Sequence, residues 1–168
     1  VLNEYSEQAS LLPGLEKSVR HAREHRSIGL GVMGLHTYLQ QQSLPFGSLL
    51  AMALNHEIFK HIREKAEQAS IKLKEHFGEP LFFPGIGRAN DLLLAVAPTK
   101  STSTIHGGHS LGIEPYKSNY HVKELSGTSY TFQNPVLRNV LQQYGKDTSD
   151  TWQQILQDNG SVKSLDFL

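Results

Sequence analysis

One short segment, a run of six apolar residues that ends at a proline, constrains the fold of this chain more than any other. Residues 92–97 read LLLAVA, which is typical of a β-strand buried on both faces. Pro98 ends that strand because its nitrogen carries no hydrogen to donate. Five hydroxyl side chains and one lysine follow within residues 99–104. The sequence predicts that a short helix begins there.

A strand, a break, a cluster of hydroxyls and a helix start together favour a phosphate-binding corner. Free N–H groups at a helix N-terminus, the positive end of the helix dipole and side-chain O–H donors all attract phosphate. The alternative is a Ser/Thr-rich helix cap that binds nothing. These residues alone leave both interpretations open.

Composition narrows the class of protein. The 168 residues amount to one domain. Sixteen basic residues balance sixteen acidic ones, so nucleic acid is not an expected partner. No apolar run reaches the roughly 18 residues of a membrane helix, and no signal-peptide pattern opens the chain, so we expect a cytoplasmic protein without a membrane partner. Cysteine is absent, which excludes disulfides, thiolate metal sites and thiol chemistry within these residues.

Helical patterns dominate the rest of the chain. The helix predicted for residues 48–77 is amphipathic and ends at Gly78. Its apolar face is expected to consist of Met52, Phe59, Ile62, Ala66, Ala69 and Leu73. In the last helix, Trp152, Ile155 and Leu156 are expected to face inward. Further helices are predicted at residues 15–25, 34–41, 134–144 and 147–157, and extended segments at residues 28–33 and 120–125. Strands that alternate with helices indicate an α/β fold.

Residues 29–34 read GLGVMG and match the G-x-G-x-x-G pattern of dinucleotide sites. That pattern requires a hydrophobic strand before the first glycine, whereas residues 21–27 read HAREHRS. The acidic residue expected about 20 positions later would fall inside the long helix. The glycines are therefore better explained by close packing against a neighbouring segment.

Two histidines and a glutamate near residue 110 resemble a loose metal-binding pattern. His106 and His109 flank two glycines, and Glu114 follows. Zinc needs three or four convergent ligands, which this spacing does not supply. No order of nucleophile, base and acid suggests acyl transfer. We therefore expect no metal ligand and no catalytic residue in this chain.

Four stretches together resemble the catalytic (large, alpha) subunit of class I ribonucleotide reductase in its bacterial and phage forms. They are residues 26–35 (RSIGLGVMGL), 97–103 (APTKSTS), 112–115 (GIEP) and 152–168, in which GSV and LDFL occur. The first three stretches also occur in class II reductases. The last, together with residues 119–120 and 122–123 before it, looks more like class I. The resemblance covers nearly the whole chain.

The resemblance implies an α/β fold in which residues 1–168 are an incomplete part of a ten-stranded α/β barrel. Residues 28–33 and 92–97 would be two of its strands. The family reduces ribonucleoside diphosphates to deoxyribonucleotides for DNA synthesis. The implied partners are a ribonucleoside diphosphate, the remainder of the large subunit and a small subunit whose metal-containing centre supplies a radical. The chain itself is expected to hold no cofactor.

By the same resemblance, the loop after the apolar strand would hold the substrate's diphosphate. We expect Lys100 to supply a counter-charge and Pro98 to form a wall near the sugar or base. The hydrogen-bond donors to the phosphate oxygens are expected to be Thr99, Ser101, Thr102 and Ser103. Relatives also carry Ala, Gly or Glu at position 100.

The family's three cysteines and a neighbouring Asn and Glu lie before the matched region, and its radical-transferring tyrosine pair lies after it. Without them the isolated chain is expected to be inactive, and we expect it to be a piece of a longer polypeptide or the product of a split gene. Half a barrel leaves apolar faces uncovered, so the isolated chain is expected to self-associate. The alternative function is a non-catalytic nucleotide- or phosphate-binding module, or an assembly module.

Overall fold

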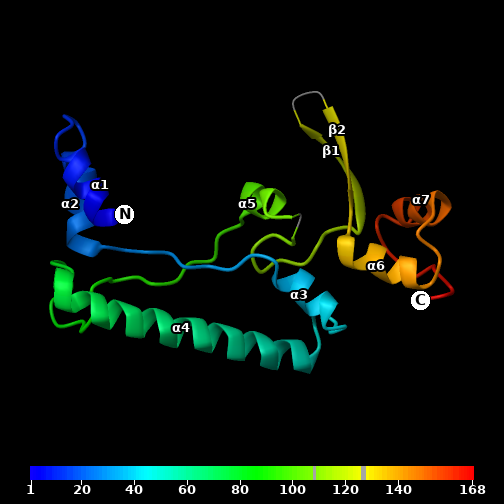
Figure 1. Cartoon of the computed structure of the whole chain (residues 1–168), viewed down its shortest axis with the longest axis horizontal. Coiled ribbons are helices and arrows are strands. Elements are labelled where there is room, and N and C mark those ends of the chain that lie inside the picture. Colours follow the sequence, from blue (N-terminus) through cyan, green and yellow to red (C-terminus); the bar gives the residue numbers. More distant parts are fainter. Residues whose placement is uncertain (108, 126–127) are drawn as a thin grey trace. The chain divides into compact units, whose positions relative to one another are not determined.

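The computed structural model describes residues 1–107, 109–125 and 128–168 (Figure 1). The chain divides into two compact units. Unit 1 consists of Val1–Val32 and Leu49–Ala97, and unit 2 of Met33–Ser48 and Pro98–Leu168. Within the described residues, no helix combines the length and the apolar character that crossing a membrane requires.

Unit 1 contains three helices, whose ends follow local sequence signals. Helix α1 (Leu2–Ala9) contacts α2 (Glu16–His25), and α4 (Leu49–Phe77) is the long helix expected from the sequence. Gly78 ends α4 with φ +71°, a conformation that glycine adopts without steric cost. Its N–H donates to the Lys74 carbonyl at 2.8 Å.

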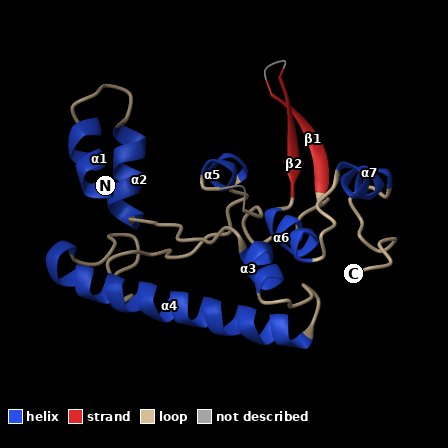
Figure 2. Ribbon diagram, turned by 45° about the vertical axis from the view of Figure 1, so that its right-hand side comes forward, coloured by secondary structure: helices blue, strands red, loops and turns tan. Residues whose placement is uncertain are grey.

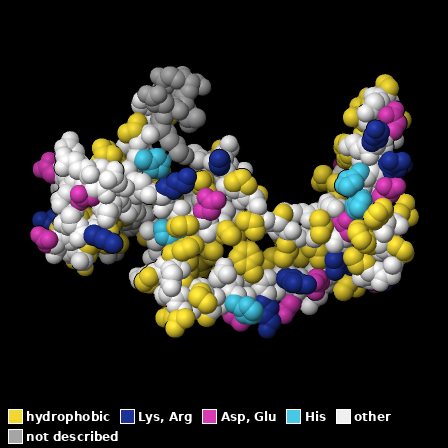
Figure 3. Space-filling view, turned by 180° about the vertical axis from the view of Figure 1, so that it is seen from behind, with side chains coloured by type: hydrophobic (Ala, Val, Ile, Leu, Met, Phe, Trp, Pro, Cys, Tyr) yellow, Lys and Arg dark blue, Asp and Glu magenta, His cyan; other side chains and the backbone are white. Residues whose placement is uncertain are grey.

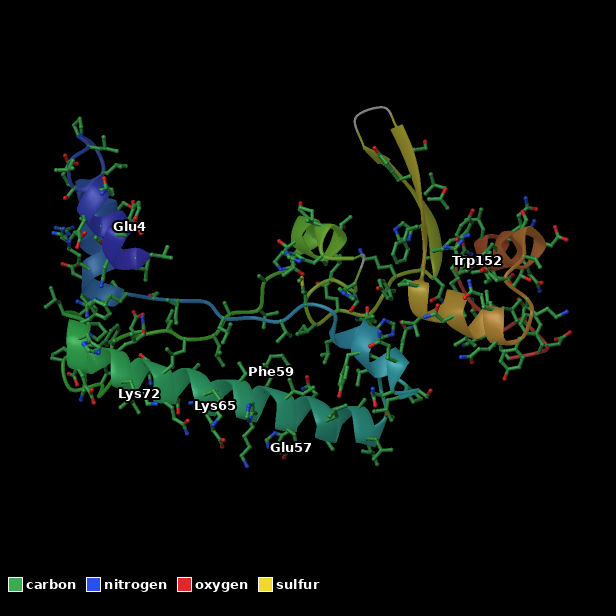
Figure 4. The ribbon with its side chains drawn as sticks, viewed as in Figure 1. Glu4, Glu57, Phe59, Lys65, Lys72 and Trp152 are labelled. Atoms are coloured by element: carbon green, nitrogen blue, oxygen red, sulfur yellow. The ribbon has the colours of Figure 1, made fainter. Side chains whose placement is uncertain are left out.

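The inward face of α4 is rotated slightly from the face expected. Ala51 and Ser70 are buried, and Phe59, Ile62 and Ala66 are half-buried as expected. Met52, Ala69 and Leu73, however, are exposed, so including them in that face was wrong. Figure 4 shows the charged side chains of Glu57, Lys65 and Lys72 on the side of α4 opposite Phe59. In Figure 3, charged side chains follow one edge of this helix and apolar side chains gather beside it.

The two extended segments of unit 1 lie parallel, but they form only a minimal ladder. Leu30 and Leu94 make an isolated parallel bridge. The Leu30 N–H donates to the Leu93 carbonyl at 2.9 Å, and the Ala95 N–H donates to the Leu30 carbonyl at 3.1 Å. The pairing of residues 28–33 with residues 92–97 is thus present without extended strands.

Burial of residues 92–97 on both faces was a wrong prediction for this chain, and residues 28–33 are also partly exposed. Leu93 is 7% exposed, but Leu92 is 61%, Val96 68% and Leu30 50% exposed. A parallel strand is buried only when neighbouring strands and covering helices enclose it. Within the described residues, these two segments have only each other as ladder partners.

The glycines of residues 29–34 serve close packing, as the sequence analysis favoured. A Cβ atom at Gly31 would lie 2.4 Å from the Ala95 carbonyl oxygen, and one at Gly29 would lie 2.9 Å from the Ala95 Cβ. Side chains at these positions would push the paired segments apart.

Unit 2 combines short helices with a two-stranded antiparallel hairpin (Figure 2). The hairpin pairs β1 (Tyr120–Leu125) with β2 (Thr128–Gln133), and Tyr120 lies opposite Gln133. The first strand matches the extended segment expected at residues 120–125; the second was not predicted. The helices are α3 (Leu35–Gln41), α5 (Lys100–Ile105), α6 (Pro135–Gln143) and α7 (Ser149–Gln157).

The core of unit 2 lies around the single tryptophan, which Figure 4 labels on α7. Trp152 and Ile155 are buried as expected, but Leu156 is 43% exposed, so its inward placement was wrong. The core cluster also includes Leu137, Leu141 and Leu165. These residues join α6, α7 and the C-terminal segment.

Asn134 begins α6 as the sequence predicts. Its Oδ1 accepts a hydrogen bond from the Val136 N–H at 3.0 Å, and Pro135 occupies the first helical position. The Asn134 side chain also donates to Gln40 on α3 and to Asn119 before β1. One buried side chain therefore ties together the start of α6, α3 and the base of the hairpin.

Candidate functional site

Thr99, the residue at which the chain enters α5, has a backbone conformation that is unusual for threonine. It adopts φ +46° and ψ +34°, in the left-handed region. For a residue with a branched Cβ this costs about 1–2 kcal/mol. Such strain persists only where surrounding contacts enforce it.

The hydroxyl of Thr99 does not cap α5. Its Oγ1 accepts a hydrogen bond from the Gly112 N–H at 2.8 Å, and no side chain of the N-cap residue bonds the helix. The first amide with a helical partner is that of Ser103, which donates to the Thr99 carbonyl at 2.9 Å. The N–H groups of Lys100, Ser101 and Thr102 have no carbonyl partner four residues earlier in the helix. The Thr99 side chain therefore does not supply the cap that the Ser/Thr-rich alternative would use.

The candidate side chains of this corner differ in accessibility. Pro98, Lys100, Ser101 and Thr102 are exposed, and Thr99 is half-buried. Ser103, in contrast, is fully buried, and its hydroxyl donates to the Lys100 carbonyl at 3.5 Å. The structure thus presents Ser101 and Thr102 as accessible hydroxyl donors and directs Ser103 into unit 2.

The segment after α5, which contains the GIEP stretch, lies between Thr99 and α3. Gly112 is buried and has φ +45°. Ser110 and Tyr116, on either side of it, form hydrogen bonds with Thr37 of α3. This segment therefore connects the candidate corner to a helix that ends far earlier in the sequence, at Gln41.

Two titratable side chains next to this segment are perturbed by burial. The Tyr116 N–H donates to Nδ1 of His36 at 3.0 Å, and the two rings pack edge to face. Burial lowers the pKa of His36, which favours its neutral, accepting form. Burial raises the pKa of Tyr116, while its hydrogen bond to Thr37 opposes that shift in part.

The loose metal pattern is not brought together as a site. His106, His109 and Glu114 are all exposed. Across residues 1–107, 109–125 and 128–168, no group of three or more His, Cys, Asp or Glu side chains is arranged to hold a metal ion.

Sequence reasoning missed Thr37 and Ser110. They are 73 positions apart, and each is an ordinary polar residue in its local context. No periodicity or spacing pairs them, because their contact exists only after α3 and the segment following α5 come together.

The fold and the geometry of this corner can be compared with known proteins. The model of the ribonucleotide reductase barrel domain matches residues 8–85 and 84–168. The chain therefore belongs to the ribonucleotide reductase barrel-domain family. This confirms the resemblance inferred from the sequence.

Individual relatives are large subunits of the reductase. The chain is 34% identical over 155 residues to the ribonucleoside-diphosphate reductase large subunit of Invertebrate iridescent virus 6, covering 91% of this chain and 16% of that protein. It is 35% identical over 166 residues to a putative large subunit of Frog virus 3, covering 98% of this chain and 29% of the relative. This chain thus spans less than a third of the length of these curated relatives.

A solved structure shows the same fold. The class Id ribonucleotide reductase alpha subunit of Actinobacillus ureae aligns with a TM-score of 0.88 and 42% identity, over 99% of this chain and 30% of that one. The prediction of an α/β fold that is one part of the reductase alpha-subunit barrel is confirmed.

Proposed function

We propose that residues 1–168 are one part of the barrel domain of a ribonucleoside-diphosphate reductase large subunit and supply its diphosphate-binding corner. The observation that carries this proposal is the uncapped start of α5, where the amides of Lys100, Ser101 and Thr102 lack helical partners. An anion satisfies such amides, and the helix dipole favours it. Family membership supports a ribonucleoside diphosphate as the ligand of this corner.

Each residue of the corner has a separate part in this proposal. The hydroxyls of Ser101 and Thr102 supplement the amides as donors to phosphate oxygens, and the exposed Lys100 supplies a counter-charge. Thr99 accepts from Gly112 through its Oγ1 and keeps its own hydroxyl proton available. Pro98 forms the wall beside the sugar or base. Ser103 packs the helix from inside unit 2.

Reduction itself needs groups that this sequence lacks. Removal of the 2′-hydroxyl in this family depends on cysteines, and the chain contains none. We therefore propose two protein partners: the remainder of the large subunit, which carries the cysteines, and a small subunit that supplies a radical from a metal-containing centre. The chain positions the substrate, and these partners perform the chemistry. A cytoplasmic location belongs to the same proposal, because nucleoside diphosphates are made and used there.

The binding test is an NMR titration of the ¹⁵N-labelled 168-residue chain with pyrophosphate and with CDP. We expect the amide signals of Lys100, Ser101 and Thr102 to shift and saturate with both ligands. Ser101→Ala should weaken binding about ten- to a hundredfold, the loss expected when one hydrogen bond to a charged group is removed. Ser149→Ala is the matched control, because Ser149 is an exposed serine in the first turn of α7.

Two results would contradict the proposal. One is the absence of any saturable shift at residues 100–102, and the other is an equal loss of affinity in the Ser149→Ala control. Reduction of CDP by the purified chain alone would contradict the assignment of the catalytic groups to a partner. Binding that saturates without any gain of reductase activity, after a cysteine-bearing large-subunit segment and a radical-supplying small subunit are added together, would favour the non-catalytic binding module.

A further inference from the structure

Two buried hydroxyl side chains in unit 2 form a reciprocal pair. The Thr37 N–H donates to Ser110 Oγ at 3.2 Å, and the Ser110 N–H donates to Thr37 Oγ1 at 2.9 Å. Thr37 is 3% exposed and Ser110 is fully buried. Because buried polar groups are costly when unpaired, this pair specifies one arrangement of α3 against the segment after α5.

Further bonds attach the same segment to α3 on both sides of the pair. The Gly34 N–H donates to the Ser110 carbonyl at 2.9 Å. The Tyr116 hydroxyl shares a hydrogen bond of 2.9 Å with Thr37 Oγ1. Residues 110–116 are therefore held at both ends by one turn of α3, which leaves Gly112 between two fixed points.

Gly112 links residues 110–116 to the candidate phosphate corner. Its N–H donates to Thr99 Oγ1 at 2.8 Å, and Thr99 is the left-handed residue that sets the direction of the first turn of α5. Without that bond, Thr99 is free to relax toward an ordinary conformation. Such a relaxation turns the amides of Lys100, Ser101 and Thr102 away from their common direction.

We infer that Thr37 is a positioning residue for the diphosphate corner, acting through Ser110, Gly112 and Thr99 without touching the ligand. This inference rests on the proposed function, since it assigns Thr37 a part in that same site. It places a residue that affects the site on α3, a helix that contributes no residue to the 98–103 loop. All the contacts involved lie within unit 2.

The test compares three variants of the full chain. Thr37→Val keeps the shape of the side chain but removes its hydroxyl, and Thr37→Ser restores the hydroxyl. Thr151→Val is the matched control, since Thr151 is a second buried threonine of unit 2 whose hydroxyl pairs with Thr148. Each variant is titrated with pyrophosphate, and the ¹⁵N amide signals of Gly112 and residues 100–102 are recorded before and after.

We expect Thr37→Val to raise the pyrophosphate Kd about tenfold and to shift the Gly112 amide signal in the free protein. Thr37→Ser should stay within about twofold of the parent chain, and so should Thr151→Val. Rescue by serine separates positioning from a general loss of stability. If Thr37→Val does not fold, Tyr116→Phe removes one bond to Thr37, and about a threefold rise in Kd is then expected.

The possible failures are distinguishable. If the parent chain binds pyrophosphate and both Thr37→Val and Tyr116→Phe bind it equally well, the positioning inference is overturned and the proposed function stands. If Thr37→Val and Thr151→Val weaken binding equally, the effect is one of stability and the inference is also overturned. If the parent chain shows no binding, the proposed function fails and the inference falls with it.

Discussion

Replacing Asn134 by alanine is expected to destabilise unit 2 strongly, because one fully buried side chain makes three hydrogen bonds there. Its Oδ1 caps α6 by accepting from the Val136 N–H, and loss of such a cap costs about 1 kcal/mol. Its Nδ2 donates to Asn119 Oδ1 at 2.7 Å and to Gln40 Oε1 at 3.1 Å. Leaving these acceptors unpaired costs about 1 kcal/mol each, so the free energy of unfolding should fall by about 3 kcal/mol.

The measurement is urea unfolding followed by the fluorescence of Trp152. This is the only tryptophan of the chain, and it is 4% exposed in the core of the same unit. Asn134→Asp keeps the capping oxygen but removes both donors and places a buried carboxylate beside the two acceptor oxygens, so it should cost about 2 kcal/mol or more. Thr148→Ala, at the exposed cap of α7, is the matched control and should cost about 1 kcal/mol. An Asn134→Ala loss no larger than that of Thr148→Ala would refute the reasoning.

Two further predictions concern unit 1. Gly31→Ala should lower the free energy of unfolding by about 2 kcal/mol or more, because the added Cβ would meet the Ala95 carbonyl oxygen at 2.4 Å. Gly47→Ala, in open space, is the control, and both variants are measured by differential scanning calorimetry. Equal melting temperatures of the two variants would contradict the close approach. Burial alone would raise the pKa of Asp91, but hydrogen bonds, the Ser27 hydroxyl first, hold it below its usual value. The ionised carboxylate therefore stabilises the fold above about pH 4, and this contribution is lost as the pH falls through the lowered pKa. The stability difference between the parent chain and Asp91→Asn should shrink as the pH falls below the ordinary carboxyl pKa of about 4, and a difference that does not change as the pH is lowered would refute the assignment.

Local signals in the sequence predicted the helices well. Gly78 ended α4, and the Asn134-Pro135 pair opened α6, because caps and turns depend on interactions within a few residues. The hydroxyl cluster after Pro98 predicted the start of α5 for the same reason. The hairpin was only half predicted, although residues 128–133 read TSYTFQ and contain the β-branched and aromatic residues that favour strands.

Burial and side-chain direction were decided by the tertiary structure. The apolar run of residues 92–97 predicted a buried strand, yet Leu92 and Val96 are exposed, because burial depends on neighbours that a local pattern does not contain. Likewise, the composition of residues 98–103 indicated an anion site. Which hydroxyls face outward follows from the Gly112 bond to Thr99 and from the packing of Ser103.

The amino-acid sequence by itself therefore determined most of the helix boundaries and the family resemblance, since both reside in short stretches of residues. Only the tertiary structure decided that Thr37 meets Ser110 across 73 positions. Long-range contacts of this kind arise from how elements pack together, and no short stretch of residues contains that information.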